Sequence, residues 1–344
     1  MNETLSQISA AVERRLERLF RDVAQGDLDG IFAARPAPAL LDCVRDLTLR
    51  GGKRLRAALV HGGARLFDPE ADRLPAVCDA AAAMELLHTY FLIHDDIMDE
   101  DETRRGGPSA HAALAAATGD AKLGRDLAIL AGDLASSLHE RLIADLDASE
   151  DRRRAAAGLF ARMHADVIHG QALDLLGAAA PEEVADHKTA SYTTVGPMAI
   201  GAALGGASVA DVARVAEIAR PIGIAFQISD DLLGAFGDPA ATGKPRGSDL
   251  RSGKSTALVR IALERADEGG RAAIRAVLGV RGASAEAIDA AIEAIARTGA
   301  RESCEERAAA LAGGAIREIE ASGFAPEGIA MIAHVARLAV FRER

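Results

Sequence analysis

The chain has 344 residues, of which 49% are hydrophobic but only 3% aromatic, with no tryptophan. Its formal net charge of -11 argues against a nucleic-acid backbone as ligand, because such a backbone needs a positive partner. Alternating runs of β-branched and aromatic residues are scarce, which favours helices over sheets. We therefore expect a soluble all-α protein, with residues 1–344 in a single domain, because no linker rich in Pro, Gly or Ser divides them.

Cys43, Cys78 and Cys304 are widely spaced and form no CxxC pair, so neither a disulfide framework nor a zinc site is indicated. The first residues are polar and charged, unlike the apolar region of a signal peptide. Charge or glycine interrupts the apolar stretches before the ~18 residues that a membrane span needs. We expect a cytoplasmic protein that is not an integral membrane protein.

Apolar residues follow helical spacing from Leu5 to Val23, which predicts an amphipathic first helix. The pair Gly51–Gly52 predicts a turn between a helix that ends near Leu49 and one that begins at 53–56. Further helices are expected over 74–100, 109–118, 121–146, 151–177, 181–196, 209–236, 254–268, 270–278, 284–297, 300–321 and 325–341. Loops rich in Gly or Pro are expected at 34–38, 104–108 and 237–247. No strand-like alternation stands out, so the prediction is one large helical bundle.

Two aspartate clusters follow apolar helical segments. The first contains Asp95, Asp96 and Asp99, whose spacings of three and four residues place the carboxylates on one helix face. The second contains Asp230 and Asp231. An acidic run is usually a solvated helix face, but acidic residues at the end of an apolar helix favour a cavity mouth. Such carboxylates suit Mg²⁺, which keeps positions for water and substrate phosphates.

Positive residues that could bind the same anion lie in several segments. Cations at the Gly51–Arg56 turn and helix start are well placed for an anion. The others are Arg104, Arg105, Lys188, Lys244 and Lys254. Each alone is more often a solvated surface base. Together with the two aspartate clusters they predict a phosphate site that uses metal ions.

An ordered set of motifs resembles the trans-isoprenyl diphosphate synthases, the polyprenyl synthetase family. The set runs from Gly51 to Thr256. Its motifs are Gly51–Arg56, Asp95–Asp99 followed by Arg104–Pro108, Gly170–Asp174, Lys188–Thr189, and Phe226–Asp231 with Gly237–Asp238 and Gly243–Lys244. One Asp-rich motif is weak support, whereas the ordered set is strong. The resemblance implies an isoprenoid synthase bundle around a central cavity, and a homodimer.

The resemblance also implies the reaction. An allylic diphosphate (dimethylallyl, geranyl or farnesyl) would lose its diphosphate, and the double bond of isopentenyl diphosphate would attack the allylic cation. The freed diphosphate would accept the proton. Mg²⁺, in roughly two to three ions per site, is implied on Asp95, Asp99 and Asp230.

Further roles are carried over by the same resemblance. Arg104, Lys188 and Lys254 would stabilise charge on the departing diphosphate. Thr189 and Gln227 would direct oxygen dipoles at the cation. The positions matched to isopentenyl diphosphate are Lys53, Arg56, His88 and Arg105. The other site positions are Asp96, Asp231, Gln171 and Lys244. His94 is expected only to pack or to pair with a carboxylate.

The second aspartate cluster departs from the family pattern, because Gly234 stands where a third carboxylate is expected. Asp238 and Asp249 could each contribute through water. We expect activity to survive, while the affinity for the metal ion held there stays open.

Tyr90 and Phe91 precede Asp95 by five and four residues, about one turn or ~6–8 Å. In the resembling family the growing prenyl tail runs along this helix. Two aromatic side chains there are therefore expected to block the tail early and to keep the product short. The farnesyl product is favoured and geranylgeranyl comes second. The competing interpretation is that both are plain core residues.

Two other functions compete with this prediction. A class I terpene cyclase would need an Asn/Asp-x-x-Ser/Thr-x-x-x-Glu motif, which the segment after Asp230 does not contain, and it has no use for a second diphosphate site at Lys53 and Arg56. A non-catalytic synthase-like subunit would explain Gly234, but the intact first cluster argues against it.

Overall fold

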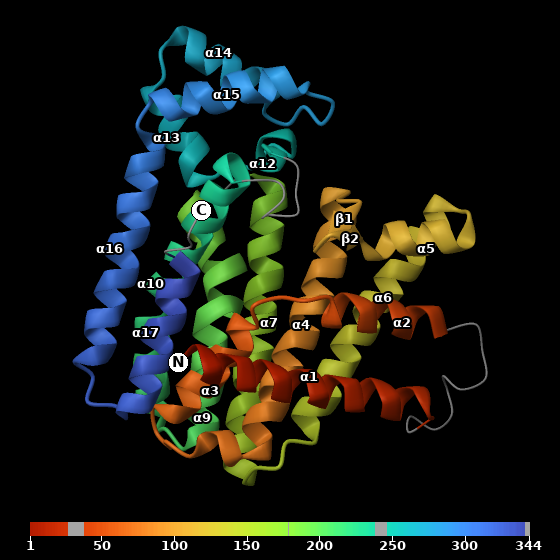
Figure 1. Cartoon of the computed structure of the whole chain (residues 1–344), viewed down its shortest axis with the longest axis vertical. Coiled ribbons are helices and arrows are strands. Elements are labelled where there is room, and N and C mark those ends of the chain that lie inside the picture. Colours follow the sequence, from red (N-terminus) through yellow and green to blue (C-terminus); the bar gives the residue numbers. More distant parts are fainter. Residues whose placement is uncertain (27–37, 178, 238–245, 341–344) are drawn as a thin grey trace. The chain divides into compact units, whose positions relative to one another are not determined.

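The computed structural model describes residues 1–26, 38–177, 179–237 and 246–340 (Figure 1). Helices account for nearly all regular structure in these residues, which confirms the all-α prediction. In the described part of the chain the one sheet is a hairpin of two-residue strands, β1 (Thr103–Arg104) and β2 (Gly107–Pro108). This hairpin lies where the sequence predicted a loop at 104–108.

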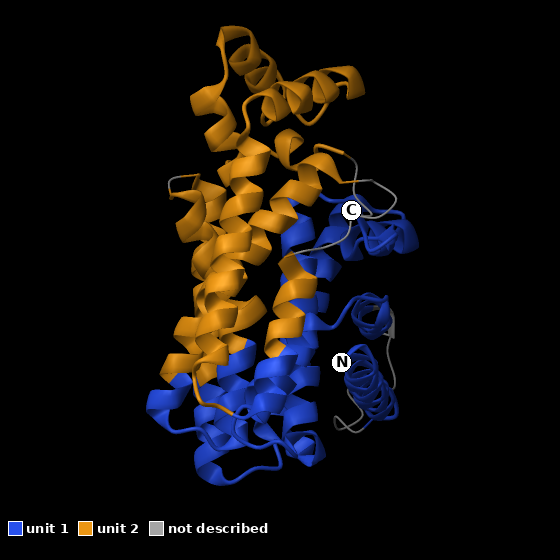
Figure 2. Cartoon of the chain, turned by 60° about the vertical axis from the view of Figure 1, so that its left-hand side comes forward, with its two compact units in different colours: residues 1–158, 197–212, 325–331 blue, residues 159–196, 213–324, 332–344 orange. Residues whose placement is uncertain are grey.

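The chain divides into two compact units (Figure 2). Unit 1 comprises residues 1–158, 197–212 and 325–331, and unit 2 comprises 159–196, 213–324 and 332–344. Unit 1 contains α1 (Asn2–Ala24), α2 (Pro38–Leu49), α3 (Leu55–Arg65), α4 (Pro75–Asp99), α5 (Ala110–Thr118) and α6 (Ala121–Ala144). Unit 2 contains α8 (Pro181–Val184), α12 (Ser248–Arg251), α13 (Ala257–Arg265), α14 (Glu268–Val277), α15 (Ala285–Arg297) and α16 (Ala300–Glu320). The helices with residues in both units are α7 (Glu150–Leu176), α9 (Gly196–Gly205), α10 (Val209–Phe236) and α17 (Pro326–Val340).

Helix α4 is the central helix of unit 1 and contacts α1, α2, α3, α5 and α6. A proline at its first position presets the helical backbone, and a run of small residues at 80–83 is fully buried. Among the described residues it is the one helix long and apolar enough to cross a membrane, and 72% of its apolar window is buried inside the protein. Two charges interrupt that window, and both are paired: Asp79 with Arg15, and Glu85 with Arg54.

Small residues let the helices approach closely, which explains how a chain with few aromatics forms a dense core. A Cβ on Gly63 of α3 would lie within 3.0 Å of the Met198 carbonyl in α9. A Cβ on Gly201 of α9 would likewise clash with the Val60 carbonyl. Since side chains cannot separate the two backbones there, glycine is required at both contacts.

The expected helix 181–196 is broken into different pieces. It begins as α8, continues as a π-helical stretch, η2 (Ala185–Val195), and passes into α9. Hydroxyls within η2 donate to main-chain carbonyls one turn back, from Ser191 to His187 and from Thr194 to Ala190. Such bonds compete with the regular ladder, and wide turns of this type are frequent at functional sites.

Candidate active site

The first aspartate cluster lies at the C-terminal end of α4. Asp95 and Asp99 are half-buried, and Asp96 is fully buried. The last turn of α4 contains no basic residue. Because the C-terminal end of a helix carries partial negative charge, the three carboxylates stand in an unfavourable field that a cation would relieve.

Asp96 pairs with Arg104, which follows it in the β1 strand. The Arg104 Nε donates to Asp96 Oδ1 over 2.8 Å, and Arg104 Nη2 also donates to Asp101 Oδ2 over 3.1 Å. Burial raises the pKa of Asp96 to about 6, and the Arg104 hydrogen bond offsets only part of that rise. In this structure Arg104, a residue predicted to bind diphosphate, is an ion-pair partner of the aspartate cluster.

Arg50 fixes the hairpin that carries Arg104 and Arg105. Its Nη1 donates to the carbonyls of Arg104 at 2.9 Å and Pro108 at 2.8 Å. A Cβ at Gly107 would come to 2.6 Å from the same Nη1, so only glycine leaves room for this guanidinium. The glycine-rich loop motif therefore has a packing reason.

Two of the residues predicted for isopentenyl diphosphate, Arg56 and Arg105, lie near a third, His88, which is buried. Burial lowers the pKa of His88 well below its usual value, and nearby positive charges lower it further. Those charges belong to Arg56, Arg105, Arg104 and Arg54. Burial and the repulsion of other arginines also lower the pKa of Arg105. We call Arg54, Arg56, Arg104 and Arg105 the arginine cluster. Burial, reinforced by this cluster, keeps the His88 imidazole neutral, and an anion would relieve the mutual repulsion of the arginines.

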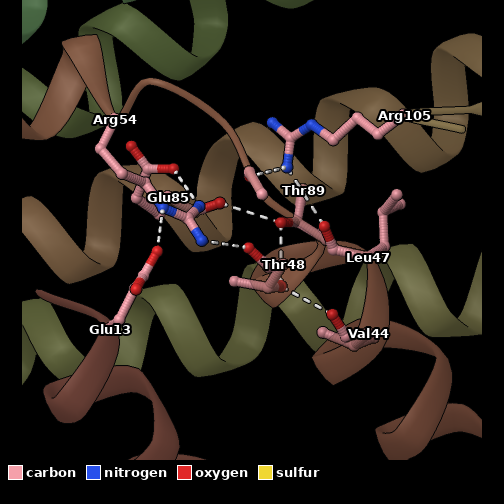
Figure 3. Close-up of polar contacts among 9 residues, drawn as sticks. Glu13, Val44, Leu47, Thr48, Arg54, Glu85, Thr89 and Arg105 are labelled. Atoms are coloured by element: carbon pink, nitrogen blue, oxygen red, sulfur yellow. Dashed lines mark hydrogen bonds and ion pairs between the residues drawn. The ribbon is translucent and has the colours of Figure 1, made fainter. Parts of the chain in front are cut away.

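Arg105 is anchored to the main chain of the glycine turn (Figure 3). Its Nη1 donates to the carbonyls of Leu47 at 3.2 Å and Gly51 at 3.3 Å. A Cβ at Gly52, whose φ is +120°, would lie 3.7 Å from the guanidinium carbon. The turn and this arginine are thus fixed together. Lys53, in the same turn, is exposed, and Arg56 is half-buried.

In unit 2, two of the predicted motifs meet. Lys188 Nζ contacts Asp174 Oδ2 at 2.6 Å, which joins the Gly170–Asp174 motif of α7 to η2. A Cβ at Gly170 would lie within 3.0 Å of the Lys188 backbone nitrogen, so glycine allows α7 to touch η2. Gln171, in the same motif, is half-buried.

Thr189, Gln227 and Asp231 form a chain of hydrogen bonds from η2 to α10. The Thr189 hydroxyl donates to Gln227 Oε1, and Gln227 Nε2 donates to Asp231 Oδ1 over 2.6 Å. Burial raises the pKa of Asp231 well above its usual value, and the charges of Asp249 and Asp230 add to the rise. The order of motifs in the sequence predicted that these residues belong together, but not that Gln227 links the other two.

Gly234 has a packing reason that the sequence did not reveal. A Cβ at this position would lie within 3.0 Å of Asp249 Oδ2, so the Asp249 carboxylate occupies the space beside the bare helix position. Of the two candidates for the missing carboxylate, Asp249 lies beside Gly234, while Asp238 lies outside the described residues. Lys244 also lies outside them. Lys254 is half-buried, and its backbone nitrogen donates to the Asp249 carbonyl at 3.0 Å.

Replacing Gly234 by alanine should therefore disturb Asp249 without removing any charge. The new Cβ must displace the short Asp249 side chain, and we expect the Mg²⁺ concentration for half-maximal turnover to rise severalfold, roughly threefold or more. A magnesium titration of activity measures it. The matched control is Gly313→Ala in α16, where a Cβ meets only the flexible end of Arg317 at 3.4 Å. Equal magnesium requirements in both variants would contradict this role of Asp249.

The carboxylates fit a divalent ion that shares its ligands with a substrate. In the described residues no three His, Cys, Asp or Glu side chains gather closely enough to hold an ion by themselves. Mg²⁺ is commonly held by one or two carboxylates together with substrate phosphates and water. The pair Asp95 and Asp99 at the end of α4 suits that arrangement, whereas a permanent cage built from protein alone does not.

Of the two residues predicted to limit product length, Tyr90 stacks on His94, which in turn packs on α6. The Tyr90 ring is 4.6 Å from the His94 ring and 5.1 Å from the Phe91 ring, between centroids. His94 Nε2 donates to the Ile129 carbonyl of α6 at 3.2 Å. A Cβ at Gly132 of α6 would overlap the His94 ring. His94 therefore packs on α6, where the absence of a side chain at Gly132 leaves room for its ring. Gly132 was not among the residues predicted from the sequence. The available signal was a glycine inside a long helix.

Comparison with solved structures shows the class of fold. The crystal structure of geranylgeranyl pyrophosphate synthase from Corynebacterium glutamicum, complexed with isoprenyl diphosphate and magnesium, matches with a TM-score of 0.91 and 32% sequence identity. The match covers 98% of this chain and 99% of that chain. The fold is the all-α isoprenoid synthase fold.

Sequence comparison then shows the family. The pattern of the family described as polyprenyl synthetase matches residues 37–295. A short chain isoprenyl diphosphate synthase of Methanothermobacter thermautotrophicus is 36% identical over 76% of this chain and 78% of its own length. A geranylfarnesyl diphosphate synthase of Aeropyrum pernix is 37% identical over 75% of this chain and 80% of its own length. The chain belongs to the polyprenyl synthetase family and is a trans-prenyltransferase.

Proposed function

We propose that this enzyme condenses isopentenyl diphosphate head-to-tail with an allylic diphosphate in a reaction that depends on Mg²⁺. The observation that carries the proposal is the arginine cluster around a neutral His88, on the same unit as the aspartate-rich end of α4. The arginine cluster suits the binding of a diphosphate, and the aspartates at the end of α4 suit a metal ion that assists the departure of a diphosphate. The isoprenyl diphosphate and magnesium bound in the Corynebacterium glutamicum enzyme support the same chemistry.

The allylic diphosphate would be bound through the aspartates. Mg²⁺, when bound, neutralises charge that develops on the leaving diphosphate. Asp95, Asp99 and Asp230 are the proposed ligands, and Arg104 is held by Asp96 close to the first two. The Lys188 ammonium, held by Asp174, would pair with the same diphosphate. Lys254 and Lys244 keep the same proposed role.

Thr189 and Gln227 would face the carbocation. Both side chains are fixed by the hydrogen-bond chain that ends on Asp231, so their oxygen atoms need little reorganisation when charge develops. No covalent nucleophile is required. No protein base is required either, because the released diphosphate can accept the proton.

Isopentenyl diphosphate would bind to Arg56 and Arg105, two members of the arginine cluster. Nη1 of Arg105 is engaged with two carbonyls, which leaves its Nη2 and Nε as donors to a phosphate. Lys53 and Arg56 would bind the same group from the glycine turn. A neutral His88 can donate one hydrogen bond there without adding charge.

A short product is proposed from the two aromatics of α4. Phe91 lies four residues before Asp95 and therefore one turn below it on the same helix face. Tyr90 packs beside Phe91 and is itself held by His94, so the barrier is supported from α6. We favour the fifteen-carbon farnesyl product, with geranylgeranyl second.

The homodimer remains a proposal, and α6 offers a surface for it. Leu123, Ile129 and Leu130 are all more than 40% exposed, which is unusual for three large apolar residues on one helix. We expect Leu130→Glu to shift the protein from dimer to monomer in light scattering. A wild-type monomer at micromolar concentration would contradict the dimer itself.

The function is tested by incubating the purified chain with isopentenyl diphosphate, geranyl diphosphate and Mg²⁺, with and without EDTA. We expect a longer prenyl diphosphate and released pyrophosphate only when the metal is present. A cyclised hydrocarbon from the allylic substrate alone would favour the terpene cyclase. A folded protein that forms no product but activates a second synthase would favour the non-catalytic subunit.

A further inference from the structure

Arg54 differs from its neighbours in the glycine turn. Lys53 is exposed and Arg56 is half-buried, whereas the Arg54 side chain is only 2% exposed. Its backbone is left-handed, with φ of +47°, which is unusual for a residue other than glycine. Such a conformation persists only when its surroundings hold it, and the contacts of the buried Arg54 side chain are part of those surroundings.

The Arg54 guanidinium joins three helices (Figure 3). Its Nη1 donates to Glu85 Oε2 of α4 at 2.7 Å, and its Nη2 donates to the Thr48 carbonyl of α2 at 2.8 Å. Its Nε reaches Glu13 Oε1 of α1 at 3.4 Å. Glu85 is 4% exposed, so the main ion pair is buried.

A second set of hydrogen bonds connects α2 and α4. The Thr48 and Thr89 hydroxyls lie 2.9 Å apart. Each hydroxyl has one hydrogen, so one of the two donates across this contact while the other donates to a carbonyl of its own helix: Thr48 to Val44 at 2.6 Å, or Thr89 to Glu85 at 3.0 Å. The end of α2, where the glycine turn begins, is therefore fixed on α4 at the level of Glu85.

Arg105 holds the same turn at a different point. Arg54 binds the carbonyl of Thr48, while Arg105 binds the carbonyls of Leu47 and Gly51. The main-chain carbonyls at and just after the end of α2 thus accept hydrogen bonds from two different arginines. Both arginines have a left-handed backbone conformation. The location of Arg105 relative to Lys53 is set through this shared turn.

Stability is a poor explanation for the Arg54–Glu85 pair. Removing two charges from water costs much of what their attraction returns, and apolar pairs of similar volume often stabilise a fold as well. A buried pair with several directed hydrogen bonds does fix geometry. Neither residue belongs to the positions assigned to a substrate.

We propose that Arg54 and Glu85 are positioning residues for isopentenyl diphosphate. Their ion pair holds the Gly51–Arg56 turn so that Lys53, Arg56 and Arg105 keep the spacing that one diphosphate requires. This inference rests on the proposed function. The allylic diphosphate is bound by other residues, so the pair governs the affinity for one substrate and leaves the other unchanged.

The test replaces both partners at once, by Arg54→Met with Glu85→Leu. The change removes one positive and one negative charge, so the net charge near His88 is kept and no buried charge is left without its partner. We expect KM for isopentenyl diphosphate to rise about tenfold or more, because a small displacement of a binding group is costly. KM for geranyl diphosphate should stay within about twofold.

An ion pair between α1 and α4, away from the glycine turn, provides the matched control. Arg15 of α1 pairs with Asp79 of α4, and their side chains are 24% and 16% exposed. Arg15→Met with Asp79→Leu makes the same chemical change away from the glycine turn. We expect both KM values to stay within about twofold of the wild type.

Circular dichroism and thermal melting establish that both double variants fold, and calorimetry measures isopentenyl diphosphate binding without turnover. The inference is overturned if the folded Arg54–Glu85 variant binds isopentenyl diphosphate as the wild type does, or if both KM values rise equally. If the wild type binds isopentenyl diphosphate but forms no condensation product, the proposed function fails, while calorimetry still decides the role of the pair.

Discussion

Asp95→Ala is expected to slow condensation roughly a thousandfold at saturating Mg²⁺, and Asp230→Ala to do the same. Each change removes a proposed ligand of an ion that draws charge from the leaving diphosphate. Asp95 is half-buried and Asp230 is exposed, so neither change leaves a cavity or an orphaned charge in the core. Steady-state turnover, followed by pyrophosphate release, gives the size of the effect.

Asp126→Ala is a suitable control, because this exposed carboxylate on α6 pairs only with the neighbouring Lys122 among the contacts described. Its turnover and melting temperature should match those of the wild type within error. If either site variant, folded and saturated with Mg²⁺, turned over at a near-normal rate, its carboxylate would not hold a catalytic ion.

Phe91→Ala combined with Tyr90→Ala is expected to lengthen the product by at least one isoprene unit. The double change removes the aromatic pair one turn below Asp95, and with it the proposed floor of the tail cavity. Mass analysis of the prenyl diphosphates, after reaction with excess isopentenyl diphosphate, records the distribution.

The single variants separate the two aromatics. Phe91→Ala should lengthen the product more than Tyr90→Ala, because Phe91 shares the helix face of Asp95, whereas Tyr90 packs on His94. Gly132→Ala should act like Tyr90→Ala, since its Cβ displaces His94. An unchanged distribution in the double variant would mean that both aromatics are core residues and that the tail lies elsewhere.

Most helices could be predicted from the sequence because apolar residues recur at helical spacing. The predicted helix 209–236 coincides with α10, and the predicted helix 284–297 differs from α15 by one residue. In α15 the buried residues lie on one face and the charges on the other, whereas α10 is recognised by its long, largely apolar sequence. Each boundary is also local: Ser284, for example, caps α15 by accepting from the Ala287 backbone nitrogen.

Other parts of the fold depend on contacts that no local pattern shows. The π-helical turn η2 packs against the α7 backbone at Gly170 and against α10 at Gly223. Its shape thus follows from two glycines in other helices. The β1–β2 hairpin similarly depends on Arg50, more than fifty residues earlier in the chain.

In the candidate site, too, the sequence predicts some features, and others depend on contacts between distant parts of the chain. The motifs identified the residue types, because a diphosphate and a divalent ion require cations and carboxylates in numbers that are rare together. The pairing of Arg104 with Asp96, and the approach of Asp249 to Gly234, depend on side-chain positions across elements. From the sequence Arg54 is one of several cations in a basic turn, but Glu85, a glutamate within an apolar helix, is a signal of a buried cationic partner.

The central claim is that the aspartates bind divalent ions together with a diphosphate. Electron paramagnetic resonance can count Mn²⁺ bound to the wild type, and to Asp95→Ala and Asp230→Ala, with and without inorganic pyrophosphate. Because no described group of three ligands can hold an ion alone, we predict weak binding that pyrophosphate strengthens, and a loss of this gain in both variants. Equal Mn²⁺ binding in all three proteins, with pyrophosphate present, would contradict the account.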